Sequence, residues 1–360
     1  MTSKPMARIV APVLALGLVA AACGGSSKKV APTTSVAPTT SSSSTIAATT
    51  TTASTVASST TVAVVPTFPF TGLPIDDPAR ANRPALVVKV NNASAARPQF
   101  GLNQADMVFE EIVEGITRFF TIFQSTDAPK IGSIRSARTS DLDLLAALSK
   151  PLFVWSGGNA YVENAVARAN VTDIGKDHHD EIFTTGRVLR DYTEFFVSTE
   201  AAYGLTPAGQ GAPAPIFTFA APSAPLPATA EDVGAVNLVL DSTKVDWTWD
   251  PTAKGWARVE DGTKHLAADG VQVAPANVVI LFVDYRQSPA DSHSPEAVTV
   301  GAGDAWVLMG GKLVRGTWSR DHNTSAFTLV DAKGQPINLT PGHTWIELSR
   351  KGGAQAQPPV

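Results

Sequence analysis

The pattern of apolar and polar positions predicts a β-hairpin between residues 105 and 125. Two β-rich runs, MVFEEIV and ITRFFTIF, flank Glu114 and Gly115, which suit a two-residue turn. Because side chains alternate between the two faces of a strand, this turn fixes which residues stand opposite one another. The expected pairs are Val113 with Ile116, Glu111 with Arg118 in reach of a cross-strand ion pair, and Glu110 with Phe119 on the other face.

A short helix is predicted between this hairpin and Pro151. Ser140 is a natural N-cap, and Asp141 and Asp143 fill the first turn, where the helix dipole favours negative charge. An apolar stripe follows at helical spacing, made of Leu142, Leu145 and Leu148.

The order of such patterns predicts an α+β fold in two domains. Strand-like and helix-like runs alternate up to about residue 205, a Pro- and Ala-rich stretch follows, and short alternating strands with regular turns come after it. We therefore expect an N-terminal mixed α/β domain followed by a smaller antiparallel β domain. The expected bounds are 1–22 for a signal peptide, 23–66 for a tether, 67–215 for the first domain, 216–235 for a linker, 236–352 for the second domain and 353–360 for a tail.

The N-terminal segment has the pattern of an export signal. Lys4 and Arg8 precede an apolar run over residues 9–22, which is shorter than the roughly 20 residues of a membrane-spanning helix. Cys23 follows small residues and is the only cysteine in the sequence. We therefore predict that Cys23 carries a lipid, with a plain secretory signal as the alternative. An extracytoplasmic protein anchored to the membrane by this lipid would follow.

The tether is almost entirely Ser, Thr, Ala, Val and Pro, a composition that buries too little apolar surface to order itself. About 40 residues of such chain would reach about 35 Å on average. The formal net charge of −4 is spread without a basic block, which argues against nucleic acid as a partner.

Two arginines before the predicted helix lack an evident counter-charge. Arg135 and Arg138 approach the helix end that already carries partial positive charge, so they require an anion nearby. An internal carboxylate is one source, and an external carboxylate or phosphate is the other. The predicted ligand-binding residues are Arg118, Arg135, Arg138, Ser136, Glu111 and Glu114.

Other candidate chemistry is weaker. His178 and His179 invite a metal-site hypothesis, but neighbouring side chains point apart, so a solvated loop is preferred and neither a metal nor a cofactor is expected. The turn at Ser156 lacks the frame of a nucleophile elbow, and no catalytic residue is assigned. The tryptophans of the second domain suit a core better than a sugar-binding surface, with Trp318 as the exception.

Several of these segments together resemble YerB-like bacterial lipoproteins. The resemblance rests on RPALVVKVNN, ARPQFGLNQADMVFEEIVEGITRFFTIFQS, IGSIRSAR and WSGGN, and continues with NVVILFVDY, GGKLVRGTWSR and GHTWIEL. It covers nearly everything after the tether. The resemblance implies a two-domain envelope lipoprotein with no known reaction. Where relatives tend to carry Pro-His-Asn before Tyr-Thr, this chain reads RDYTEFFVST over residues 190–199, without the histidine.

Two functions of different classes follow from these patterns. The favoured hypothesis is a tethered envelope protein that binds an anionic wall polymer or lipid headgroup through an arginine-lined cleft. The alternative is a glycan hydrolase or transferase that uses Glu110, Glu111 or Glu114 as acid and base. A structural partner in a protein assembly is a third reading.

Overall fold

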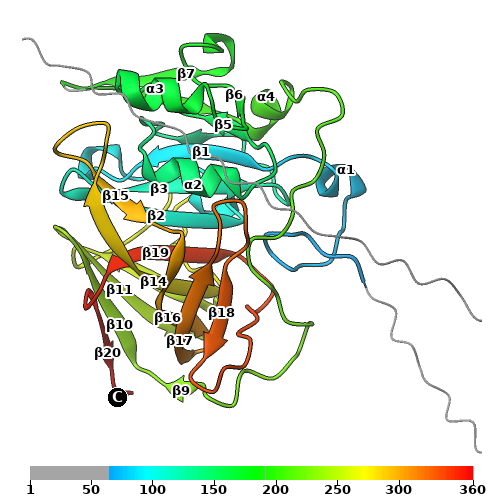
Figure 1. Ribbon diagram of the computed structural model, residues 1–360, viewed down its shortest axis with the longest axis vertical. Helices are drawn as coiled ribbons and strands as arrows, with labels where there is room; N and C mark the ends of the chain where they lie inside the picture. Colours follow the sequence, from blue (N-terminus) through cyan, green and yellow to red (C-terminus); the bar gives the residue numbers. More distant parts are fainter. Residues whose placement is uncertain (1–64, 191, 360) are drawn as a thin grey trace, which may run out of the picture. The chain divides into compact units, whose positions relative to one another are not determined.

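One long β-sheet runs through both halves of the chain (Figure 1). The computed structural model describes residues 65–190 and 192–359. Strand β19 (Thr344–Arg350) lies between β2 (Met107–Val113) and β14 (Asn277–Gln287) and is parallel to both. The sheet has twelve strands in the described residues, ordered β18 (Thr328–Asp331), β17 (Lys312–Arg320), β16 (Gly301–Met309), β14, β19, β2, β3 (Ile116–Phe123), β1 (Leu86–Asn91), β5 (Leu152–Val154) and β6 (Thr172–Asp173), with β15 (Pro295–Val298) paired to β14 and β9 (Glu231–Asp232) paired to β17.

Two smaller sheets complete the described part. A five-stranded antiparallel sheet belongs to the C-terminal half, and a three-stranded sheet belongs to the N-terminal half. The first has the order β13 (Thr263–Lys264), β12 (Gly255–Glu260), β11 (Thr243–Asp250), β10 (Ala235–Leu240) and β20 (Ala354–Gln357); the second has the order β4 (Ile131–Gly132), β8 (Thr193–Val197) and β7 (Thr184–Val188).

Helices are few and short. They are α1 (Pro78–Ala81), α2 (Ser140–Ala146), α3 (Ala160–Val166) and α4 (Thr199–Tyr203), with 3-10 turns at Ser94–Ala96, Leu102–Gln104 and Asp180–Ile182. The fold is thus mainly β with a few helices, all of the described ones before residue 205. The expected separate antiparallel domain is not confirmed, because β19 pairs in parallel with a strand from each half.

The predicted hairpin register is confirmed. Strands β2 and β3 pair Val113 with Ile116 and Glu111 with Arg118. Gly115 takes the left-handed conformation that this tight turn requires, with φ of 81°.

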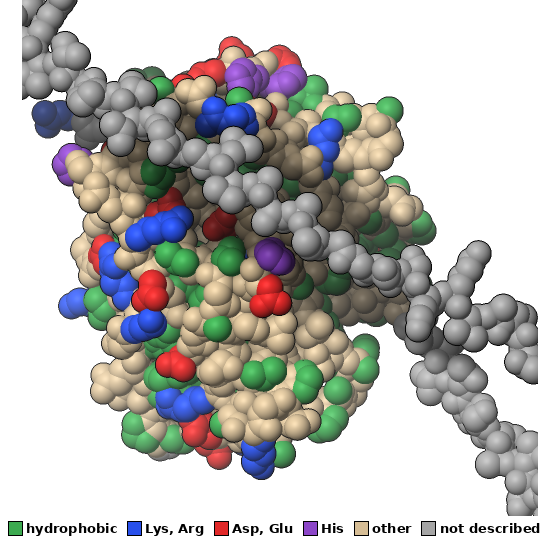
Figure 2. All heavy atoms as spheres, viewed as in Figure 1, with side chains coloured by type: hydrophobic (Ala, Val, Ile, Leu, Met, Phe, Trp, Pro, Cys, Tyr) green, Lys and Arg blue, Asp and Glu red, His purple; other side chains and the backbone are tan. Residues whose placement is uncertain are grey.

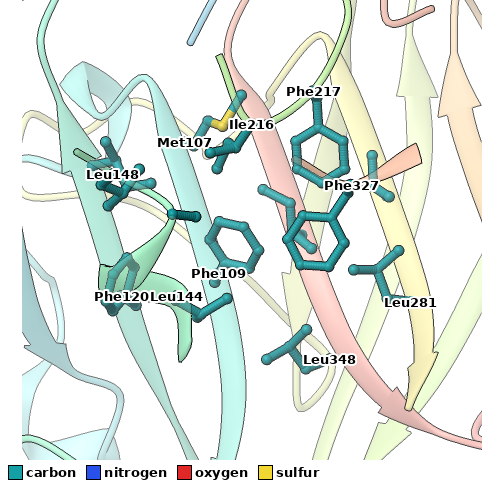
Figure 3. Packing of buried hydrophobic residues seen from close by; sticks show 14 of the residues in the cluster. Met107, Phe109, Phe120, Leu144, Leu148, Ile216, Phe217, Leu281, Phe327 and Leu348 are labelled. Carbon is teal, nitrogen blue, oxygen red and sulfur yellow. The ribbon is translucent and has the colours of Figure 1, made fainter. Parts of the chain in front are cut away.

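The hairpin separates two hydrophobic cores. Phe109 of β2 and Phe120 of β3 lie on one face, with ring centroids 6.1 Å apart. Figure 3 shows Leu144 and Leu148 beside them, so α2 covers this face. The other face packs against the five-stranded sheet through buried aromatic and aliphatic side chains, among them Phe119, Trp247, Trp256 and Trp345.

Trp318 does not form the exposed surface that its sequence context suggested. Its side chain is 2% exposed, and its indole N–H donates to the carbonyl of Phe282 over 3.2 Å. That expectation was wrong, because Trp318 faces the core that contains Phe327.

The predicted linker begins with two core residues. Ile216 and Phe217 are buried, and the Phe217 ring stacks on Phe327 at 5.1 Å between centroids. The start of this segment is therefore fixed to the main sheet, while the linker as a flexible boundary stays a prediction.

The expected signal peptide, Cys23 and nearly all of the tether lie outside the described residues. Within residues 65–190 and 192–359, no helix combines the length and apolarity needed to cross a membrane.

Candidate functional site

The arginines meet at one edge of the main sheet. Strands β1 and β5 are parallel, so Asn91 and the segment after Val154 lie at the same edge, the carboxyl ends where α/β sheets commonly bind ligands. Arg118 is the cross-strand partner of Asn91. The backbone N–H of Arg135 donates to Lys89 of β1, which brings the IRSAR segment to this edge.

Glu114 in the hairpin turn is shared by two of the arginines. Arg138 Nε donates to Glu114 Oε1 over 2.8 Å, and Arg118 Nη2 lies 3.4 Å from Glu114 Oε2. Ser294 Oγ also donates to Glu114 Oε1, over 2.8 Å. Burial raises the pKa of this carboxyl, but Arg118 and Arg138 outweigh burial, so the pKa of Glu114 is lowered. Glu114 is therefore an ionised counter-charge and a poor acid.

Arg118 is the most buried of the three arginines. Burial first, and the nearby charge of Arg138 second, lower its pKa to about 10. Its Nη1 donates to the carbonyl of Ser136 over 3.2 Å, and its buried Nε has no hydrogen-bond partner among the described residues. Ser136 thus contributes its backbone oxygen to this cluster. The nearby carboxylates of Glu114 and Glu111 therefore do not fully offset the effect of burial on the Arg118 guanidinium.

Arg135 stacks on an aromatic ring. Its guanidinium carbon lies 4.5 Å from the ring centroid of Tyr192, and the structure gives it no ion pair within residues 65–190 and 192–359. Its Nε is also buried without a hydrogen-bond partner in that part of the chain. Burial lowers the pKa of Arg135, and Arg138 adds to this effect. The Nε–H of Arg135 is therefore a hydrogen-bond donor that residues 65–190 and 192–359 do not use.

Glu111 binds Lys89, which was not among the predicted site residues. Lys89 Nζ lies 2.5 Å from Glu111 Oε1 and 2.7 Å from Asp141 Oδ1, and all three side chains are fully buried. Burial raises the pKa of Glu111, and Asp141 raises it further. The expected ion pair between Glu111 and Arg118 is replaced by this buried cluster, although the two residues stand opposite one another as predicted.

Glu110 belongs to a different buried network on the other face. Its carboxylate accepts two hydrogen bonds from Arg258, at 2.9 and 2.7 Å, and one from Trp345. Burial raises its pKa, and Arg258 opposes that change. Glu110 and Glu111 are each 0% exposed, so neither carboxylate reaches a polymeric substrate in this structure.

The helix start differs from the predicted N-cap. Thr139 occupies the cap position without a side-chain cap bond, and Ser140 Oγ instead accepts from the N–H of Ala297. Asp141 receives the N–H of Arg138 on Oδ2, over 2.7 Å. Ser140 therefore ties α2 to β15, and Asp141 holds the IRSAR segment against the helix.

The two adjacent histidines approach different carboxylates. His178 Nδ1 lies 3.0 Å from Asp173 Oδ2, whereas His179 Nδ1 lies 2.8 Å from Glu181 Oε1. The two side chains diverge from a turn in which both backbone N–H groups donate to the carbonyl of Gly175.

Lys89 and Tyr192 contact the predicted site residues but were not predicted from the sequence. Of the two, Lys89 had a recognisable sequence signal. Lys89 interrupts an apolar strand, LVVKV, and a buried lysine requires an acidic partner. Tyr192 lies in the segment where the chain departs from the YerB-like pattern, and its sequence context gave no such signal.

One face of the molecule is not dominated by one sign of charge. Lys and Arg side chains are interspersed with Asp and Glu on the face drawn in Figure 2.

Comparison with known proteins identifies the family. Residues 70–205 match the "Protein of unknown function (DUF3048) N-terminal domain", and residues 235–346 match the corresponding C-terminal domain. The "Putative lipoprotein YerB" of Bacillus subtilis (strain 168) is 28% identical over 293 residues, which cover 78% of this chain and 85% of that protein. The crystal structure of YerB from Bacillus subtilis superposes with a TM-score of 0.69 at 22% identity, covering 81% of this chain and 99% of that one. The chain therefore belongs to the two-domain DUF3048 family that includes YerB.

Proposed function

We propose that this protein is a tethered cell-envelope protein that binds an anionic wall or membrane component through Arg118, Arg135 and Arg138. The observation that carries the proposal is a local imbalance of charge. Three guanidinium groups influence one another electrostatically, and Glu114 is the carboxylate that pairs with two of them. An added anion would offset the remaining positive charge of the cluster.

The proposal does not depend on the helix dipole. Helix α2 has only seven residues, and the N–H of Arg138 already donates to Asp141. Binding would come from the arginines themselves, which hold carboxylate or phosphate in two-pronged hydrogen bonds. A lipidated Cys23 and the predicted tether would let such a module search the nearby surface.

Binding measurements on the chain from residue 24 onward test this proposal. The probes are inorganic polyphosphate, short oligogalacturonate and phosphatidylglycerol vesicles, each titrated into wild type and the double variant R135Q/R138Q. The variant is expected to lose at least about tenfold in affinity, because hydrogen bonds to charged groups each contribute about 1.5–3 kcal/mol. R315Q is the matched control, because Arg315 is an arginine paired with Glu231 on the C-terminal half.

Thermal melts separate binding from a structural role. If the arginines serve a ligand, R135Q/R138Q keeps its melting temperature and loses affinity. A large drop in melting temperature, with no probe bound by wild type, would instead show that internal carboxylates neutralise these arginines. The variant D191N belongs in the set, since Asp191 lies outside the described residues and adjoins Tyr192 in sequence. Destabilisation by D191N that matches that of R135Q would identify Asp191 as the partner of Arg135 and overturn the proposal.

A further inference from the structure

A polar pocket lies next to the backbone segment that carries Arg135 and Arg138. It has a volume of about 390 Å³, within the range of about 300–1,000 Å³ typical of small-molecule sites. The loops after β5 and β6 and one face of α3 form its walls. The side chains that matter for recognition are those of Trp155, Glu163, Asn164, Lys176, Asp177 and His178.

Backbone hydrogen bonds join this pocket to the arginine cluster. The N–H of Ala137 donates to the carbonyl of Gly157 over 3.2 Å, and the N–H of Ser156 donates to the carbonyl of Arg135 over 3.1 Å. Gly157 and Trp155 line the pocket, and Ser156 lies between them in sequence. One wall of the pocket is therefore fixed to the segment that carries Arg135 and Arg138.

The polar groups of the pocket suit a ligand rich in hydroxyl groups. His178 lies against Asp173 through Nδ1, which leaves its Nε2 available, and Glu163 and Asn164 are exposed on α3. Asp173 is held in place because Oδ1 accepts the indole N–H of Trp155 over 2.7 Å. Trp155 is only 4% exposed, so it forms the floor and offers no open ring face for stacking. Recognition in this pocket would depend on hydrogen bonds.

The pocket and the arginine cluster carry different charges, so they suit different parts of one ligand. Glu163 and Asp177 place carboxylates at the pocket, and Lys176 is paired with Asp180, so an anionic group is disfavoured there. Arg135 and Arg138 favour an anionic group next to it. A hydroxylated ring in the pocket, with its acidic group on the arginine side, satisfies both.

We infer that the anionic partner is an acidic glycan, with one sugar ring in the pocket of His178 and Glu163 and its carboxylate or phosphate at Arg135 and Arg138. This inference rests on the proposed function and narrows its ligand class. A lipid headgroup would use the arginines without filling the pocket. A glycan with regularly spaced acidic groups uses both.

Paired variants with different probes test the glycan inference. H178A/N164A is measured against short oligogalacturonate, which has a ring and a carboxylate in each unit, and against inorganic polyphosphate, which has no ring. The variant is expected to bind oligogalacturonate about tenfold more weakly, as for the loss of one or two polar contacts, and to bind polyphosphate like wild type. H179A is the matched control, because His179 faces Glu181 and is not among the residues that line the pocket.

The outcomes distinguish this inference from the proposed function. If H178A/N164A binds oligogalacturonate as wild type does, or wild type binds only polyphosphate or phosphatidylglycerol vesicles, the glycan inference is overturned and the arginine site stands. If R135Q/R138Q binds every probe as wild type does, the arginine site is overturned as well. Melting temperatures of all variants are compared with wild type, since both pocket side chains are exposed and their replacement should leave the fold intact.

Discussion

Replacing Lys89 with methionine would test how strongly the stability of the protein depends on a buried charge. Lys89 Nζ lies 2.5 Å from Glu111 and 2.7 Å from Asp141, and none of the three side chains reaches solvent. Methionine matches the length of the lysine stem but carries no charge. Two carboxylates would then face one another in the interior without a cation.

The expected cost follows from that geometry. Removing one partner of a buried ion pair costs about 3–5 kcal/mol, because the remaining charge stays desolvated. The free energy of unfolding of a typical domain is about 5–15 kcal/mol, so K89M should lose a large share of it. K312M is the matched control: Lys312 pairs with Asp232, its side chain is 40% exposed, and an exposed pair contributes about 0–1 kcal/mol.

The cost should also depend on pH. Burial first and Asp141 second raise the pKa of Glu111, while Lys89 opposes them, so the pKa of Glu111 in K89M should rise further. A carboxyl whose folded-state pKa is raised favours the folded state at low pH, and that contribution is lost as pH increases through the folded pKa. K89M should therefore be less destabilised at about pH 5 than at about pH 8.

Urea denaturation followed by tryptophan fluorescence measures these differences directly. The double variant K89M/E111Q should recover part of the lost stability, because Glu111 would no longer place a second carboxylate beside Asp141. A loss below about 1 kcal/mol at neutral pH, or an equal loss at both pH values, would refute the buried triad as a charged cluster.

Three further predictions concern the anchor and the joining of the two halves. Cys23→Ala should release the protein from the membrane fraction or leave its signal uncleaved, and wild-type protein found only in the soluble fraction would contradict lipid attachment. R258M should lower the free energy of unfolding by about 3–5 kcal/mol in urea denaturation, because Glu110 and Glu260 would stay buried without the cation they share. A loss as small as that for an exposed ion pair would argue against a stabilising role for Arg258. A non-specific protease should cut first, after the tether, in the exposed stretches between residues 206 and 228, with the nicked halves eluting together in gel filtration because β19 pairs with β2; halves that separate would disprove this coupling.

The hairpin was predictable from sequence because its determinants are local. Strand alternation has a period of two residues, and the tight turn at Glu114 and Gly115 leaves a single register that keeps Phe109 and Phe120 on one buried face. The same local reasoning placed α2 correctly. It failed for the Ser140 cap, because Ser140 Oγ is engaged by Ala297, which is 157 residues away in the chain.

The charge partners could not be predicted, because they depend on distant segments. Lys89 meets Glu111 and Asp141 across 22 and 52 residues, and Arg258 meets Glu110 across 148 residues. The contact of Arg258 with Glu110 follows from the insertion of β19 between β2 and β14, which brings the five-stranded sheet against the N-terminal half. The contacts of Lys89 follow from the strand order β2-β3-β1 and from the position of α2 beside it. Composition and periodicity identify charged residues in apolar strands, but they do not say which of them meet.

The two arginines before α2 illustrate this limit, because their partners in the folded chain differ. Arg138 has an internal partner in Glu114, whereas Arg135 stacks on Tyr192 without an ion pair in the described residues. Glu114 would therefore compete with any bound anion for Arg138.

Glu114→Gln tests that competition directly. The lowered pKa of Glu114 means that it is ionised at neutral pH, so the substitution removes one negative charge from the arginine cluster and keeps the side-chain shape. If the cluster binds an anion, E114Q should bind polyphosphate more tightly, on the order of tenfold, with the gain shrinking as salt is added. The melting temperature should fall by little, because the Glu114 side chain is 34% exposed. A folded E114Q with unchanged or weaker affinity would mean that Glu114 and the arginines form a closed structural unit, and that no anion enters it.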